Sequence, residues 1–357
     1  MISFPFALPP RYKFAGDRLS GGQGYVYICH DEFLDRKVAI KVIKNILDTE
    51  TVNAELAAML DVRSPHVAEV YDLIFARRSH MAGLVQEFVC GESLETYKSR
   101  GIRGDQLTLW QLASGLADIH GRGRLHRDIK PSNIRFDAEG VLKILDFGIA
   151  SKIESDAETV RARGTRGFLA PEFYGTPPIP LEFAADVYAF GVTTWYLVSN
   201  SNLPHPLTEM PPQRNERVPT LSTVLLEWPP DLVEILDRSL SVDPEIRPRI
   251  HEIREALEKY LLYGKHRATF SYNGRSVNLD TPGKTLKLGV GSDIVVIAYN
   301  GLSFTINSVN GDVYLNNTVV VPGMDVPGSC VFTLGAPPLG PRRIFVPMDL
   351  SHPEVIL

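Results

Sequence analysis

Four short strings of polar and glycine residues, in a fixed order along the first half of the chain, constrain this sequence more than any other feature. A glycine-rich run occupies residues 20–27 and is followed by Lys41 within the apolar run at residues 38–43. Two further strings, Leu-His-Arg-Asp-Ile-Lys-Pro-Ser-Asn and Leu-Asp-Phe-Gly, occupy residues 125–133 and 145–148. Each string could arise by chance, but their order, spacing and expected setting agree. We therefore predict that all four belong to one folded unit.

The first two strings have the chemistry of a phosphate site. Gly21, Gly22 and Gly24 let backbone N–H groups approach phosphate oxygens, although a lone glycine-rich run is more often a structural turn. Lys41 follows on a strand-like run, where an inward-facing lysine needs an anion. Glu55 lies in the helical stretch that follows. Alone it would be a solvated carboxylate, but with Lys41 it becomes a candidate ion pair.

The pattern of apolar residues changes twice along the chain. Residues 12–89 contain short β-rich runs around one helical stretch, whereas residues 90–264 are mainly helical up to the glycine that ends the last helix. We expect a small β-rich lobe and a larger helical lobe with these bounds, followed by an all-β domain at residues 265–357. In that domain we predict strands at residues 268–272, 285–288, 293–299, 302–309, 312–315 and 330–334.

Composition excludes several classes of protein. With 357 residues, 44% hydrophobic and 22% charged, the sequence is typical of folded chains with more than one domain. A net charge of −5 provides no basic field to collect phosphates, so we expect no nucleic-acid partner. No apolar run is long enough to cross a bilayer, and we expect a cytoplasmic protein without direct membrane insertion. The three cysteines lack metal-type spacing and are expected to be isolated buried thiols, with a disulfide left open.

Taken together, the four strings resemble the signature of eukaryotic-like bacterial serine/threonine protein kinases over roughly residues 12–262. The resemblance implies an α+β, bilobal protein-kinase fold with a β-rich N-lobe and a helical C-lobe. It also implies transfer of the γ-phosphoryl group of ATP, with Mg²⁺, to Ser or Thr of protein substrates. Two alternatives are a pseudokinase scaffold and a small-molecule phosphotransferase.

The resemblance assigns chemistry to four residues of the last two strings. Asp128 is implied to orient the substrate hydroxyl and accept its proton, and Lys130 to stabilise charge on the transferred phosphoryl group. Asn133 and Asp146 are implied to hold magnesium, because oxygen ligands on separate loops suit a hard, hydrated cation. A pseudokinase would usually have lost Lys41, Asp128, Asn133 or Asp146, and all four are present here.

Nucleotide contacts are implied by the same resemblance. Lys41 would hold the α- and β-phosphates while Glu55 holds Lys41, and the segment at residues 86–89 would hydrogen-bond the base from its backbone. Arg135 stands where these kinases place an apolar floor beneath adenine, so its stem could pack there or its guanidinium could stack on the base. The residues expected to contact the nucleotide are Gly21, Gly22, Gly24, Val26, Ala39, Lys41, Glu87, Val89 and Arg135.

Regulation and substrate access are implied by the segment that follows Asp146. Arg127 marks the subclass in which a phosphate on this segment pairs with the arginine, and we expect autophosphorylation at Thr159 or Ser155. Thr165 is expected to bond the catalytic residues. Alternatively, these hydroxyls only solvate a loop.

Residues 164–172 resemble the peptide platform of protein kinases, which related small-molecule kinases usually lack. The resemblance further implies that Asp186 lies on the helix that braces the catalytic loop. It also implies that Arg247 pairs with Glu172. These residues would be structural braces.

The last ninety or so residues weakly resemble forkhead-associated β-sandwiches, and a small OB-like β-barrel is a comparable interpretation. Val290 stands where the sandwich family has its phosphate-binding arginine, so phosphopeptide binding is not expected. We expect instead a module that docks partner proteins. The resemblance to these kinases also implies a cognate phosphatase as a candidate partner.

Overall fold

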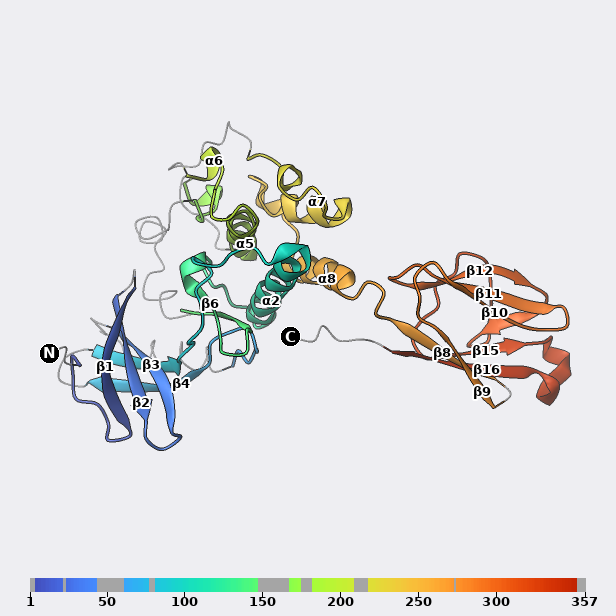
Figure 1. Cartoon of the computed structure of the whole chain (residues 1–357), viewed down its shortest axis with the longest axis horizontal. Coiled ribbons are helices and arrows are strands. Elements are labelled where there is room, and N and C mark those ends of the chain that lie inside the picture. Colours follow the sequence, from blue (N-terminus) through green and yellow to red (C-terminus); the bar gives the residue numbers. More distant parts are fainter. Residues whose placement is uncertain are drawn as a thin grey trace. The chain divides into compact units, whose positions relative to one another are not determined.

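The computed structural model of the chain divides it into two compact units, Met1–Leu257 and Glu258–Leu357 (Figure 1). Their boundary falls inside helix α8 (Ile250–Leu261), a few residues before the predicted domain boundary, and the three predicted sets of domain bounds stay predictions. The described residues are 4–21, 24–43, 61–76, 81–146, 167–174, 182–208, 218–272 and 274–351.

Five antiparallel strands form the N-terminal sheet, in the order β1-β2-β3-β5-β4. Register decides which side chains share a face, because residues opposite each other in neighbouring strands point the same way. Val26 lies opposite Lys41, and Ile28 lies opposite Ala39. The other face packs a buried aromatic and aliphatic cluster that includes Tyr27. The strands are β1 Tyr12–Gly21, β2 Gly24–Asp31, β3 Arg36–Ile43, β4 Val70–Ala76 and β5 Met81–Glu87.

Helices dominate the rest of the first unit, together with one short hairpin of β6 and β7. Among the described residues, no helix combines the length and apolar character needed to cross a membrane. The elements are α2 Gly101–Gly121, η1 Pro131–Asn133, β6 Ile134–Phe136, β7 Leu142–Ile144, η2 Pro171–Tyr174, α5 Phe183–Val198, α6 His205–Thr208, η3 Leu221–Thr223, α7 Pro230–Arg238, η4 Pro244–Ile246 and α8.

Helix α2 is the centre of this helical part. Its fully buried residues Leu109, Leu112, Leu116 and Ile119 recur at helical spacing, which places them on one stripe. Gly115 on the same helix allows the β6–β7 hairpin to approach, since a Cβ there would lie 2.8 Å from the backbone oxygen of the residue before Val67 and 2.8 Å from a methyl of β7. The buried stripe of α2 therefore positions the loop between α2 and β6.

The second unit consists of two antiparallel sheets. One has six strands in the order β14-β13-β15-β16-β8-β9, and the other has three in the order β10-β11-β12. The strands are β8 Arg267–Tyr272, β9 Arg275–Leu279, β10 Thr285–Val290, β11 Asp293–Tyr299, β12 Phe304–Asn310, β13 Val313–Leu315, β14 Thr318–Val319, β15 Cys330–Leu334 and β16 Ile344–Ser351.

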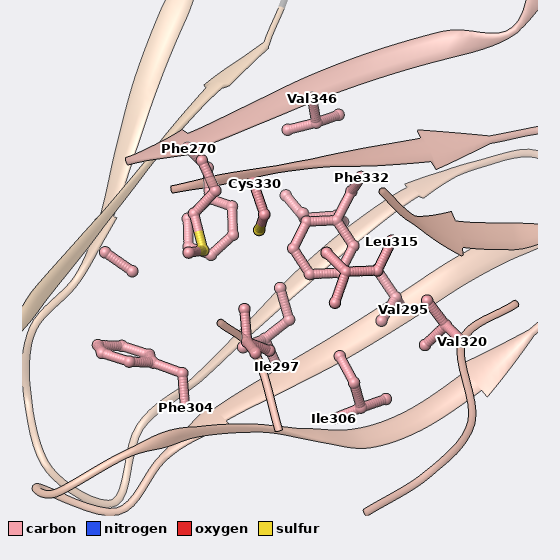
Figure 2. Packing of buried hydrophobic residues seen from close by; sticks show 14 of the residues in the cluster. Phe270, Val295, Ile297, Phe304, Ile306, Leu315, Val320, Cys330, Phe332 and Val346 are labelled. Carbon is pink, nitrogen blue, oxygen red and sulfur yellow. The ribbon is translucent and has the colours of Figure 1, made fainter. Parts of the chain in front are cut away.

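An apolar core fills the space between these two sheets, as Figure 2 shows. Phe270 and Phe332 come from the six-stranded sheet, whereas Ile297 and Ile306 come from the three-stranded sheet. All four are at most 1% exposed. The six strands predicted from the sequence are present, with shifted ends in several cases.

The sequence reasoning missed three strands of this unit, β9, β14 and β16. Strand β16 lies between β15 and β8 in the sheet, although it contains Pro347, and proline usually argues against an interior strand. Strand β9 is almost entirely exposed, so it lacks the apolar alternation that marks a half-buried strand.

Candidate active site

The loop that connects α2 with β6 is held by one buried carboxylate. Asp186 of α5 is 2% exposed and accepts hydrogen bonds from the backbone N–H of His126 at 2.8 Å and of Arg127 at 2.7 Å. His120 Nε2 lies 2.9 Å from the same carboxylate. Burial works to raise the pKa of Asp186, but its hydrogen bonds with His120 and with the backbone N–H of His126 hold that pKa below its ordinary value. Ionised Asp186 thus anchors the loop, which confirms the predicted brace.

His126 links the loop to the strand that precedes Asp146. Its Nδ1 accepts a hydrogen bond from the backbone N–H of Asp128 at 3.2 Å. Nε2 therefore carries the ring proton and donates to the carbonyl of Leu145 at 2.9 Å. Arg127 and Asp146 both adopt left-handed φ angles, 69° and 59°, which are uncommon for residues with a side chain. The backbone thus takes an uncommon conformation directly before Asp128 and at Asp146.

Three of the predicted catalytic and metal-binding residues meet in this loop. Lys130 Nζ lies 2.8 Å from Asp128 Oδ2. Asn133 Nδ2 donates to the same Oδ2 at 2.9 Å and to the Asp128 backbone oxygen at 2.8 Å. Asn133 is 7% exposed, whereas the Asp128 side chain is 24% exposed. The carboxylate is thus fixed by two donors and still open to an incoming hydroxyl group.

Lys41 connects the N-terminal sheet to this loop region. Its Nζ lies 3.0 Å from Asp146 Oδ1, and the two side chains are 13% and 22% exposed. The sequence predicted Glu55 as the partner of Lys41, but Glu55 lies outside the described residues. The pairing with Asp146 was not predicted.

The donor set fits magnesium. No group of three or more His, Cys, Asp or Glu side chains that could hold a metal occurs in the part of the chain that the structure describes. Mg²⁺ does not require such a group, because it retains waters and binds through one or two protein oxygens together with phosphates. The carboxylate of Asp146 and the amide oxygen of Asn133 are ligands of that kind.

The face of the sheet that carries Lys41 also carries the predicted adenine contacts. Val26 and Ala39 share this face with Lys41 through their register. Glu87 ends β5, and its carboxylate contacts Lys143 Nζ at 3.2 Å and the backbone N–H of Glu69 at 3.2 Å. These contacts occupy the Glu87 side chain.

Val89 lies in the segment after β5 and is 6% exposed. Gly21 and Gly24 pair with each other at the end of the β1–β2 hairpin. The remaining predicted residues, Gly22, Ser155, Thr159 and Thr165, lie outside the described residues, as does Phe147.

Arg135 of β6 is directed at the segment that follows β5. Its Nη2 donates to the carbonyl of Gly91 at 2.5 Å. Strand β6 packs directly against Gly91, because a Cβ at this position would lie 2.2 Å from the carbonyl oxygen of Phe136. Together with the Lys143–Glu87 contact on β7, this bond ties the hairpin to the segment at residues 87–91. Sequence reasoning missed Lys143, although it directly faces Arg135 across the hairpin.

A buried ion pair holds the end of the predicted peptide platform. Arg247 donates two hydrogen bonds to the Glu172 carboxylate, at 2.7 and 2.8 Å, and its side chain is fully buried. It also donates to the carbonyls of Ser241 and Ala184. The predicted pairing is therefore confirmed. Beside Asp128, a small hollow is lined by the platform residue Phe168 and other residues of η2 and α5.

Comparisons with known proteins agree with this geometry. A family model described as protein kinase domain matches residues 19–258. The serine/threonine-protein kinase pkn2 of Myxococcus xanthus is 36% identical over 278 residues, which cover 70% of this chain and 32% of the relative. The serine/threonine-protein kinase PknA of Mycobacterium tuberculosis is 31% identical over 260 residues, 68% of this chain and 59% of the relative. CBL-interacting protein kinase 25 of Oryza sativa subsp. japonica is 30% identical over 276 residues, 70% of this chain and 51% of the relative. The chain thus spans between a third and three-fifths of these relatives.

Proposed function

The chain belongs to the protein kinase domain family, and from that premise we propose that it transfers the γ-phosphoryl group of MgATP to serine or threonine of protein substrates. The observation that carries the proposal is the Asp128 carboxylate held at hydrogen-bond distance by Lys130 and Asn133. The observed Glu172–Arg247 pair supports protein rather than metabolite acceptors, because it fixes the end of the segment that resembles a peptide platform.

In the proposed reaction, Asp128 accepts the proton of the acceptor hydroxyl while that oxygen bonds to the γ-phosphorus. The bond between the γ-phosphorus and the bridging oxygen breaks, and ADP leaves with the electron pair. Lys130 neutralises charge on the transferred group. Asn133 and Asp146 would hold Mg²⁺, which would supply charge stabilisation at the phosphates.

Nucleotide binding uses the face of the sheet around Lys41. Lys41 holds the α- and β-phosphates, with Glu55 as its further partner, while Gly21, Gly22 and Gly24 cover the phosphates through their backbone. The roof over adenine is Val26 and Ala39, and the backbone at Glu87 and Val89 bonds the base. The Arg135 guanidinium donates to Gly91, which favours packing of the arginine stem under the nucleotide over stacking of its charged end.

Regulation is proposed to act through the same loop. A phosphate at Thr159 or Ser155 pairs with Arg127 and orders the segment after Asp146, and Thr165 bonds the catalytic pair. Since Arg127 is positioned directly by Asp186, such a phosphate would act one residue away from Asp128.

The domain at residues 265–357 is proposed to dock partner proteins, following lobes at residues 12–89 and 90–264. Two separate sheets around one core support the sandwich interpretation over the barrel. We place the protein in the cytoplasm, with a cognate phosphatase as a candidate partner.

Acceptor class is the direct test of this proposal. The purified chain is incubated with γ-labelled ATP and magnesium, with casein-type and basic proteins in one arm and a panel of hydroxylated metabolites in the other. Label in phosphoserine or phosphothreonine of protein supports the proposal. Label confined to metabolites would establish a small-molecule phosphotransferase, and absence of MgATP binding would establish a pseudokinase.

A further inference from the structure

An open groove lies in the second unit, between the six-stranded and the three-stranded sheets. Its volume is about 500 Å³, within the range of roughly 300 to 1,000 Å³ that is typical of ligand sites. Strands β8 and β9 form one wall and β10 forms the other. The apolar lining residues are Phe270, Val277, Leu286, Leu288, Leu334 and Val346.

The groove exists because the two sheets differ in width. Strand β9 ends the six-stranded sheet and β10 ends the three-stranded sheet, so each has one neighbour among the strands that the structure describes. Val277, which lines the groove from β9, is 46% exposed. An edge strand also directs half of its N–H and C=O groups away from its sheet. The groove therefore offers both apolar surface and unpaired backbone groups.

The positive charge of the groove favours an acidic ligand. Arg275 and Lys287 line it and are both exposed, and no lining residue is acidic. Within the described residues, neither cation forms an ion pair. Along β10, Leu286 and Leu288 are the more buried residues and Lys287 between them is exposed. A strand added beside β10 would thus have one row of side chains beside Leu286 and Leu288 and the opposite row beside Lys287.

We propose that this groove binds an extended acidic peptide of a partner protein, which adds as a strand to the free edge of β10. The inward side chains of the peptide are apolar and pack beside Leu286 and Val277, and its outward Asp or Glu carboxylates lie near Lys287. Arg275, on the same face of β9 as Val277, adds positive charge to the groove. In this binding mode, main-chain hydrogen bonds provide affinity, and the alternation of side chains provides specificity. Peptide binding at this groove does not depend on phosphoryl transfer, so it can be tested separately from the kinase proposal.

The test measures binding of labelled ten-residue peptides to the full chain by fluorescence anisotropy. The supporting peptide alternates Val with Glu, and its comparison peptides replace Glu with Lys, rearrange the same residues into blocks, or N-methylate alternate amides. We expect binding of the Val/Glu peptide only. Arg275→Glu together with Lys287→Glu should weaken that binding about tenfold, because the groove changes from positive to negative and repels the Glu carboxylates.

Arg342→Glu is the matched control, since Arg342 is an exposed arginine of the same unit outside the groove. It should leave peptide affinity unchanged, and thermal melts of all variants verify that the unit stays folded. Equal binding of the Val/Glu and Val/Lys peptides would overturn the proposal. So would an equal loss in Arg342→Glu, or binding that requires phosphothreonine in place of Glu. As a second measurement, amide exchange on β10 should slow when the Val/Glu peptide is bound, and unchanged exchange there would also overturn it.

Discussion

The two units of this chain bury different chemistry. Met1–Leu257 buries ionised or ionisable side chains, among them Asp31, Asp186 and Arg247, each at most 6% exposed. Among the described residues of Glu258–Leu357, the buried side chains include no charged group, and their polar groups are the hydroxyls of Thr333 and Tyr299. Buried charges are expensive unless each is paired and hydrogen-bonded. Their placement in the first unit alone shows where the chain needs fixed geometry in addition to a stable fold.

Two of these buried charged residues hold segments close to the candidate site. Asp186 fixes the loop that carries Asp128, and Arg247 holds Glu172. The second unit is a scaffold held by apolar area, whose proposed function lies at its edge. Substitutions in the two units should therefore differ in kind as well as in size.

The largest expected effect is on the stability of the first unit. Glu172→Ala leaves the fully buried Arg247 without its carboxylate, and breaking a buried pair in this way costs about 4 kcal/mol. The matched control is Glu92→Ala, which removes an exposed partner of Arg100 and should cost less than about 1 kcal/mol. Urea unfolding measures both. Equal losses of unfolding free energy in the two variants would contradict a larger contribution from the buried Arg247–Glu172 pair.

A core truncation in the second unit should be slightly smaller and should stay local. Leu315 is 2% exposed, and Leu315→Ala should cost about 3 kcal/mol through lost burial and a residual cavity. Leu339→Ala, at a position 38% exposed, is the control and should change stability by less than about 0.5 kcal/mol. Phosphoryl transfer should be unchanged in both variants. A fall in transfer with Leu315→Ala would contradict independent cores.

A moderate effect on nucleotide affinity is expected from Arg135→Leu. The change removes the hydrogen bond to Gly91, so the segment at residues 87–91 is held less firmly against β6. We expect the KM for ATP to rise up to about tenfold, equivalent to about 1.4 kcal/mol, with a smaller change in kcat. Arg124→Leu, at an exposed position, should change neither. An unchanged KM in Arg135→Leu would remove Arg135 from the nucleotide site.

Acid should weaken the first unit progressively. Because the folded-state pKa of Asp186 is lowered, its contribution to stability is present above the unfolded value of about 3.9 and is lost as pH falls through the folded value. The pKa of Asp31 is lowered as well, mainly by its hydrogen bond with Arg11. Urea unfolding at pH 7, 5, 4 and 3 should show this loss below pH 4, and Asp186→Asn should flatten it. An identical profile in that variant would contradict the assignment.

Thiol labelling perturbs the protein least and reports on each unit separately. Burial raises the pKa of Cys29 in the N-terminal sheet to about 12 and that of Cys330 in the sandwich to about 11. Cys90 is exposed, which corrects the expectation that all three thiols are buried. At pH 8 only Cys90 should react in the folded chain, with the other two reacting as their units unfold in urea. Rapid native labelling of Cys29 would contradict the buried sheet core.

Local strings predicted much of the first unit because their residues act close together in sequence. Asp128, Lys130 and Asn133 lie within six residues and meet as expected, and Asp186 and Arg247 were found through motifs. The contact between Lys41 and Asp146 joins segments far apart in the chain, so no local pattern could show it.

The limits of prediction in the second unit have a different cause. Strand β9 is nearly all exposed and therefore lacks the period-two pattern on which strand prediction depends. Strand β16 does alternate buried and exposed residues, but it contains Pro347, which argues against a strand. Tertiary pairing decides both. The groove between β9 and β10 was accordingly absent from the sequence-based expectations.

The central claim is that the loop held by Asp186 carries phosphoryl transfer at Asp128. Its most direct test compares the full chain with Asp128→Asn and with Glu139→Gln, an exposed carboxylate of the β6–β7 turn. Single-turnover transfer from MgATP to a protein acceptor is measured beside MgATP affinity. The account predicts that Asp128→Asn binds MgATP within a few-fold of the unaltered chain yet transfers about 10² to 10⁴ times more slowly, with Glu139→Gln unaffected. Equal transfer rates in all three proteins would contradict it.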